Sequence, residues 1–278
     1  MNNVNQLFAA RYGHAASIAG LDEVGPGNDV LASILRHRSV RAYADKPLDP
    51  GTLPRLIAAA QSASSSSNLQ AWSVVAVRDD QRKQRLSRLA ANQAHIRRAP
   101  LFLVWLADLA RLARVAERRG LPHDGLAYFE LFLLAVIDAA LAAQNAVLAA
   151  EALGLGTVYI GGIRNHPLEV AAELALPPAV FPVFGLCVGH PDPEQPTAIK
   201  PRLPQRAVLH HETYGDPAAQ DAAVDDYDDV MAAFYEAQKM DTPGPWSIHS
   251  SKRVSGPGSL AGRDRLQAFV QALGFPLR

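Results

Sequence analysis

The chain has 278 residues, of which 49% are hydrophobic and 19% are charged, so it can form a sizeable core and is not a disordered chain. Its 27 Lys and Arg residues balance 27 Asp and Glu residues, which leaves no overall field to attract nucleic acid or an anionic membrane. Its single cysteine, Cys187, excludes an intramolecular disulfide and favours a reducing, cytoplasmic location.

The first half of the chain predicts helices around a few strands. Residues 1–20 look helical, residues 20–29 form a loop, and a short helix then ends near Arg38. Because no basic start leads into an apolar stretch, we expect no signal peptide. Further on we predict helices over 49–63 and 80–99, strands over 72–79 and 100–108, and a serine-rich loop at 64–68.

The second half is dominated by an apolar helix predicted over residues 126–153, which ends at Gly154. Polar residues interrupt it before it reaches the roughly 18 apolar residues of a membrane span, so we expect a central helix buried on most sides and no membrane insertion. Beyond it we predict strands over 157–162 and 182–191, helices over 166–176, 221–239 and 263–273, an extended segment at 191–204, and irregular structure over 241–262.

This mixture of strands with more numerous helices predicts an α+β fold, with a central sheet and helices on its faces. The strand at 182–191 does not alternate between apolar and polar residues, so we expect it to be buried on both faces.

The stretch "HRSVR", residues 37–41, concentrates cations in a short segment. If its backbone is extended, His37, Ser39 and Arg41 share one face, whereas Arg38 and Val40 share the other. A guanidinium fork, a hydroxyl and an imidazole on one face suit a phosphate group. A solvated basic turn at the end of a helix accounts for the same residues equally well.

Three further elements have the chemistry of a ligand site. Lys200 and Arg202 in "KPRLP" face the same side of an extended segment, although two such charges also suit a surface loop. The strand "TVYI" leads into Gly161 and Gly162, whose backbone a flat ligand can approach closely. The hydroxyls of "SSSSNLQ" can bind a polar ligand, and a flexible linker is the alternative.

Several well-known motifs are absent from the sequence. There is no GxGxxG at a strand–helix junction, no P-loop, no HExxH, no CxxC, and no Ser-His-Asp spacing. The adjacent His210 and His211 lack partners at metal-ligand spacing. We therefore expect neither a metal site nor a nucleophilic side chain.

The segments "HRSVR", "SSSSNLQ", "LGLGTVYIGGIRN", "FGLCVGHP" and "KPRLP" occur in an order that resembles the nitroreductase superfamily. The resemblance is to the major oxygen-insensitive NADPH nitroreductases and to flavin reductase P, from about residue 31 to the C-terminus. It implies an FMN enzyme with a central mixed or antiparallel sheet, folded as an intertwined homodimer. Residues 31–278 are then the FMN-binding domain, and residues 1–30 are an N-terminal helical extension.

The resemblance also implies which residues bind FMN. The FMN phosphate is expected at His37, Arg38, Ser39, Arg41, Lys200 and Arg202. Contacts to the ribityl chain or the ring are expected from Ser65, Ser67 and Gln93. The isoalloxazine is expected along Tyr159, Ile160, Gly161 and Gly162.

The activity that the resemblance implies is hydride transfer from NADPH or NADH to flavin N5, followed by two-electron reduction of nitroaromatics, quinones or flavins. The chemistry is then centred on the flavin, and no side chain acts as a nucleophile. The arginine-rich loop that holds the 2′-phosphate of NADPH in the family is reduced here to Lys239, with Lys252 and Arg253 as possible substitutes. The choice between the two nucleotides therefore stays open.

Three alternatives remain at this stage. A superfamily relative could cleave flavin or remove a halogen from its substrate. A non-catalytic module could bind flavin without oxidising NAD(P)H. The basic helix 81–98 could bind nucleic acid, although a solvated helix face is favoured by the zero net charge.

Overall fold

The structure is a computed structural model that describes residues 4–13, 28–242 and 244–278. The chain divides into two compact units. The sheet unit comprises Ser39–Pro196 and Ala261–Arg278, and the helical unit comprises the residues up to Arg38 together with Thr197–Leu260. The sequence did not indicate this division, in which N-terminal residues join a segment about 160 residues further along the chain.

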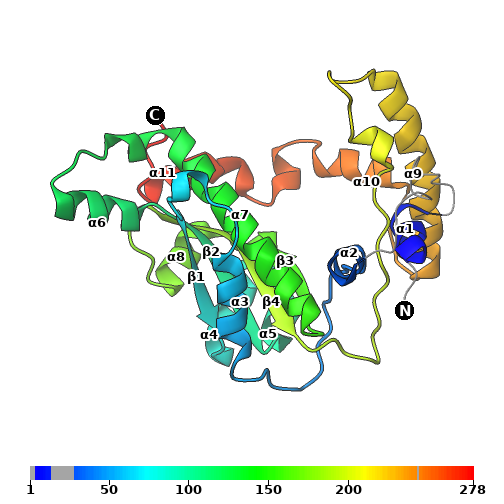
Figure 1. Ribbon diagram of the computed structural model, residues 1–278, viewed down its shortest axis with the longest axis horizontal. Coiled ribbons are helices and arrows are strands. Elements are labelled where there is room, and N and C mark those ends of the chain that lie inside the picture. The colour runs from blue at the N-terminus through cyan, green and yellow to red at the C-terminus, as the bar shows by residue number, and fades with distance from the viewer. Residues whose placement is uncertain (1–3, 14–27, 243) are drawn as a thin grey trace. The chain divides into compact units, whose positions relative to one another are not determined.

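The sheet unit contains four strands: β1 (Trp72–Val77), β2 (Leu101–Asp108), β3 (Gly156–Ile160) and β4 (Val180–Gly189). They lie in the order β1-β2-β4-β3, and every neighbouring pair is antiparallel. Figure 1 shows helices on the faces of this sheet. The predicted α+β fold with an antiparallel sheet flanked by helices is therefore confirmed.

The helices of this unit are α3 (Thr52–Gln61), α4 (Asp80–Leu89), α5 (Ala94–Arg98), α6 (Ala110–Arg119), α7 (Phe129–Ala152), α8 (Pro167–Glu173) and α11 (Leu266–Ala272). Residues of β2 alternate between two cores, as the pleat of a strand requires. Leu101, Leu103 and Trp105 pack with α3 and α7 on one face. Phe102 and Val104 pack with α4, α5 and α8 on the other. Both faces are covered, so β2 and β4 are buried along nearly their whole length, as predicted for residues 182–191.

The predicted helix at 126–153 is confirmed as α7, but its predicted burial is not. Gly154 takes the left-handed conformation that ends the helix, with φ +74°. The expectation that the helix is buried on most sides is wrong, because only one face packs into the unit. Alanines dominate that face, and apolar side chains four residues apart stay exposed on the other: Phe129, Leu133, Ile137 and Leu141. By length and composition α7 could cross a membrane, but its buried face makes it a core helix of this unit.

The sequence did not predict two local features of the sheet unit. Residues 80–99 form two helices, because Ala91 and Asn92 take left-handed backbone conformations between α4 and α5. This break places Gln93 at the N-cap of α5. Helix α6 was not predicted at all.

The helical unit contains α1 (Val4–Tyr12), α2 (Asp29–Leu35), α9 (Pro217–Ala237) and α10 (Trp246–Arg253). Asn28 caps α2 by accepting a hydrogen bond from the Leu31 amide, and α2 ends before Arg38. Most of the predicted loop at 20–29 lies outside the described residues. The prediction of irregular structure over 241–262 is wrong, because α10 begins there after Pro245, a residue that helix starts tolerate.

Candidate functional site

A buried arginine of α1 joins the two cationic segments within the helical unit. Arg11 is only 7% exposed, and its guanidinium donates to the carbonyl oxygens of Leu35, His37 and Lys200, each at 2.9 Å. The Arg11 carbonyl in turn accepts from the Arg202 amide at 2.8 Å. The backbones that carry His37 and Lys200 are therefore held on one side chain, although 163 residues separate them in the sequence.

The side chains of Lys200 and Arg202 are exposed and lie beside a cavity of the helical unit. The Lys200 Nζ atom is 5.8 Å from the centre of the Phe234 ring. The carbonyl between the two cations, that of Pro201, accepts from the Tyr227 hydroxyl at 2.9 Å. The cavity, about 700 Å³, is lined by cationic and aromatic side chains that include Arg253 and Trp246. This combination suits a ligand that has a flat ring and a phosphate.

Residues 39–41 lie against the sheet. Ser39 forms a parallel bridge with Thr157 of β3, and the Val40 amide donates to the Thr157 carbonyl at 2.8 Å. Val40 is buried, whereas Arg41 is exposed. The segment expected to bind a phosphate therefore continues directly into contact with the strand that leads to the glycine pair.

The end of β3 is packed against Gln93. A Cβ atom at Gly162 would lie 2.7 Å from Gln93 Nε2 and 3.1 Å from the Ala90 carbonyl oxygen, so any side chain there would displace Gln93 and press on the Ala90 backbone. Ile160 is buried at 1% exposure, whereas Tyr159 is 37% exposed and its ring packs edge-on against Phe184. The structure therefore brings together Gln93 and the predicted glycine pair.

Two arginines that the sequence did not single out flank the same strand end. The position of a Cβ atom at Gly161 is 3.5 Å from an Arg164 Nη atom and 3.8 Å from one of Arg263. Arg164 also donates to the Val183 carbonyl. Burial, and secondarily the charge of Arg263, lowers the pKa of the Arg164 guanidinium. Two cations so close together favour an anionic group beside Gly161.

The serine loop is held by a buried carboxylate. Ser65 donates its hydroxyl hydrogen to Asp138 of α7 at 2.7 Å and accepts from the Gln70 amide at 2.8 Å. Ser67 is exposed, with a left-handed φ of 49°. Asp138 appears in the sequence only as a polar interruption of an apolar helix, and that interruption is the one signal that could have marked it.

Three cations of the basic helix in the nucleic-acid alternative make contacts within the protein. Lys83 is 4% exposed and donates to the Ala99 carbonyl at 2.8 Å. Arg82 and Arg85 both form ion pairs with Glu173 of α8. Three cations of this helix are thus committed to contacts within the protein, which disfavours a phosphate-binding face.

Two family models match the chain. The model of the nitroreductase family matches residues 34–190, and that of the C-terminal domain of the same family matches residues 200–278. The chain is 45% identical over 189 residues to FMN reductase (NADPH) of Bacillus subtilis, an alignment that covers 67% of this chain and 75% of the relative. It is 39% identical over 214 residues to the oxygen-insensitive NADPH nitroreductase of Salmonella typhimurium, covering 77% and 85%.

Solved structures agree with these matches. NfrA2 of B. megaterium superposes with a TM-score of 0.84 at 39% identity, covering 91% of this chain and 100% of its own. The similarity therefore includes both the sheet unit and most of the helical unit.

Proposed function

The chain belongs to the nitroreductase family, and we propose that it is an FMN-dependent NAD(P)H oxidoreductase that reduces nitroaromatics, quinones or flavins. The relatives named as an FMN reductase and a nitroreductase support this activity. Bound FMN supplies the redox chemistry, taking hydride from NAD(P)H and passing two electrons to an acceptor, which predicts ping-pong kinetics.

The observation that carries the proposal is the junction at Arg11. Because one guanidinium holds the backbones of His37 and Lys200, the cations of two distant segments gather in one unit. We assign the FMN phosphate to His37, Arg38, Lys200 and Arg202, and to Ser39 and Arg41, which continue the chain. Hydrogen bonds from cationic groups to a phosphate are among the strongest that a protein makes.

The glycine end of β3 fits a flat ring. Gly162 and Gln93 are already in close contact, and Gly161 presents backbone without a side chain. We assign the ring to Tyr159, Ile160, Gly161 and Gly162, with polar contacts from Gln93, Ser65 and Ser67. Arg164 and Arg263 add positive charge at this strand end, which stabilises the negative charge that a reduced flavin carries.

The nucleotide is NADPH or NADH. NADPH is named for both relatives reported above. In this chain Lys252 and Arg253 lie in the last turn of α10, and Arg253 lines the same cavity as Lys200 and Arg202. These cations replace the arginine-rich loop as candidates for binding a 2′-phosphate.

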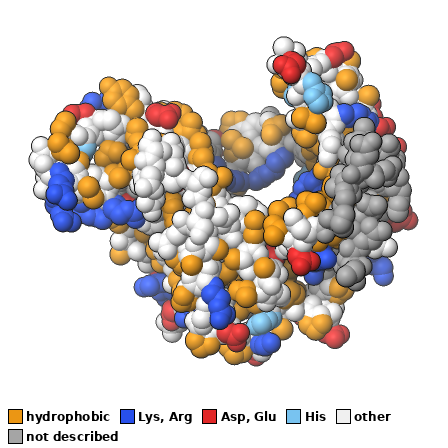
Figure 2. Space-filling model, viewed as in Figure 1, with side chains coloured by type: hydrophobic (Ala, Val, Ile, Leu, Met, Phe, Trp, Pro, Cys, Tyr) orange, Lys and Arg blue, Asp and Glu red, His pale blue; other side chains and the backbone are white. Residues whose placement is uncertain are grey.

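The exposed stripe of α7 supports an intertwined homodimer. Phe129, Leu133, Ile137 and Leu141 repeat at the four-residue spacing of one helix face and are 41–51% exposed. A contiguous apolar surface of this kind marks a protein interface. Figure 2 shows apolar side chains at the surface over this helix. We further propose that residues 31–278 are the FMN-binding domain, that residues 1–30 are an extension, and that the protein is cytoplasmic, consistent with its one buried cysteine.

The test is spectroscopic. Purified protein incubated with FMN should be yellow, bleach on addition of NADPH or NADH without oxygen, and recover its colour with a quinone or a nitrofuran. Steady-state kinetics with both nucleotides then determine the preferred one. Protein that remains colourless after incubation with FMN contradicts the proposal.

A further inference from the structure

The serine loop has an unfavourable backbone. Ser67, Asn68 and Gln70 all have positive φ, between 49° and 54°, and none is glycine. The left-handed region is disfavoured for residues with a Cβ atom, and such conformations persist only where the surrounding structure imposes them. The shape of this loop therefore requires external support.

That support comes on one side from Asp138, which is 1% exposed. Its Oδ2 atom accepts from the Ser65 hydroxyl at 2.7 Å and from the Ala71 amide at 3.0 Å, and its Oδ1 atom accepts from the Ser66 amide at 3.3 Å. One carboxylate thus binds both ends of the loop. The desolvation cost of a buried charge must be offset by hydrogen bonds, and here the loop itself makes them.

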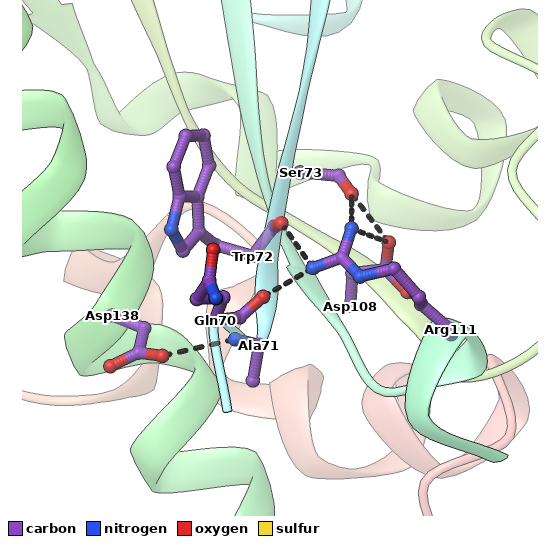
Figure 3. A network of polar contacts seen from close by, with 7 residues as sticks. All are labelled: Gln70, Ala71, Trp72, Ser73, Asp108, Arg111 and Asp138. Atoms are coloured by element: carbon purple, nitrogen blue, oxygen red, sulfur yellow. Dashed lines mark hydrogen bonds and ion pairs between the residues drawn. The ribbon is translucent and has the colours of Figure 1, made fainter. Parts of the chain in front are cut away.

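On the other side the support is cationic. Arg111 at the start of α6 donates to the carbonyl oxygens of Gln70 and Trp72, and its Nη1 atom is 3.6 Å from Asp108. Figure 3 shows the carboxylate of Asp138 and the guanidinium of Arg111 on opposite sides of this segment. N–H groups of the loop thus point to an anion, and its carbonyl groups point to a cation.

We propose that Asp138 is a positioning residue for the cofactor, which holds the 65–71 loop in its left-handed shape so that the loop binds FMN. The identity of the ligand rests on the proposed function, whereas the role of Asp138 in supporting the loop rests on its own hydrogen bonds. Replacement by asparagine puts an NH2 group where a carboxylate oxygen now accepts, so at least one N–H or O–H of the loop loses its partner.

The first measurement is hydrogen exchange of the apo-protein. In Asp138→Asn the amides of residues 65–71 should exchange at least about tenfold faster, while those of β2 keep their wild-type rates. The matched control is Asp124→Asn, the same change at an exposed residue of the same unit. Unchanged exchange in the loop would overturn the proposal, whether or not the protein binds FMN.

The second measurement is the FMN dissociation constant, from fluorescence titration of the apo-proteins. Asp138→Asn should raise it at least about tenfold, and Asp124→Asn should leave it unchanged. A wild-type protein that does not bind FMN defeats the proposed function, whereas a wild-type affinity in Asp138→Asn with a loosened loop defeats this inference alone.

A milder variant covers the case in which Asp138→Asn does not fold. Ser65→Ala removes one of the three donors to Asp138, and it should accelerate exchange of the loop and raise the FMN dissociation constant to a smaller degree. Where both variants fold, the loop amides of the double variant should exchange in the apo-protein about as fast as those of Asp138→Asn alone, because both changes act through one contact. Fully additive increases in the exchange rate would show that Ser65 supports the loop independently of Asp138 and would overturn the proposed linkage.

Discussion

Arg11 and Asp138 perform complementary tasks in the two units. Arg11, a buried cation in the helical unit, donates to three carbonyl groups from two distant segments. Asp138, a buried anion in the sheet unit, accepts from two amides and a hydroxyl at the two ends of one loop. In both cases an ionised side chain fixes backbone that is expected to bind the cofactor.

The difference between them lies in what each side chain gathers. Arg11 joins segments that loop-closure entropy would otherwise keep apart, so its loss affects how the helical unit assembles. Asp138 restrains a short loop whose ends already belong to neighbouring elements, so its loss affects local shape. The role of a buried charge therefore depends on which backbone segments it holds in place. Removing each of the two side chains tests this conclusion.

Removal of the Arg11 side chain should have the largest effect. Arg11→Ala leaves three carbonyl groups without their charged donor, and hydrogen bonds of this kind contribute about 1.5–3 kcal/mol each. We expect a loss of at least about 4 kcal/mol in the free energy of unfolding, measured by denaturant titration, together with weaker FMN binding. Arg114→Ala, at an exposed position of α6, is the control and should change neither quantity. Wild-type stability in Arg11→Ala would show that the two segments assemble without it.

The second test concerns the exposed face of α7, which carries Ile137 next to the buried Asp138. Ile137 is 49% exposed on α7, whereas Asp138 faces the loop. Ile137→Lys would bury an unpaired charge in the proposed interface, which costs about 3 kcal/mol or more and should convert the dimer to monomer in sedimentation velocity. Leu168→Lys, the corresponding change at an exposed leucine of α8, should leave the dimer intact. A dimer that survives Ile137→Lys would place the interface elsewhere.

Single arginines of the phosphate segment should have smaller effects. Arg41→Ala removes the charge-assisted contact that we propose to the FMN phosphate, worth about 1.5–3 kcal/mol, and should raise the FMN dissociation constant about tenfold or more. Arg38→Ala should matter less, because the alternation of extended backbone places Arg38 on the opposite face. Flavin content after dialysis ranks the two variants. Equal losses would contradict the alternation, and full retention by Arg41→Ala would contradict its assignment.

The elements that could be predicted from the sequence are those whose local pattern determines them. The four strands and α7 follow from apolar runs bounded by turn residues, and Gly154 ends its helix as its type requires. The exposed face of α7 could not be predicted, because apolar residues on an exposed helix face have the same composition as those that pack into a core. Helix α10 was missed because Pro245 and the turn residues around it are typical of a loop, although Pro245 is the N-cap residue of this helix.

The candidate site divides in the same way. The cationic segments could be predicted because their charged side chains point to a ligand, and the glycine pair because its bare backbone does. Arg11 and Asp138 give no pattern that points to a ligand, since they bind mainly backbone, and backbone partners are set by tertiary structure and not by sequence spacing. Gln93 was identified through the resemblance, but its contact with Gly162 depends on the left-handed break before α5.

The smallest effect on stability is expected at an exposed charge cluster, which contrasts with the buried Arg11 and Asp138. Glu173 pairs with Arg82 and Arg85 at distances of 3.1 and 2.8 Å, and the hydrogen bond from Arg85 is the main reason that the pKa of this carboxyl is lowered. A lowered carboxyl pKa stabilises the folded state above its ordinary value of 4.5, and this stabilisation disappears as the pH falls through the folded-state value. Glu173→Gln should therefore have a slightly lower melting temperature than wild type at pH 7 and nearly the same one in acid, with a smaller gap in high salt. A loss of unfolding free energy at pH 7 as large as that of Arg11→Ala would mean that an exposed ion pair stabilises this protein as strongly as a buried charge bound to backbone. The distinction between the two kinds of charge would then fail.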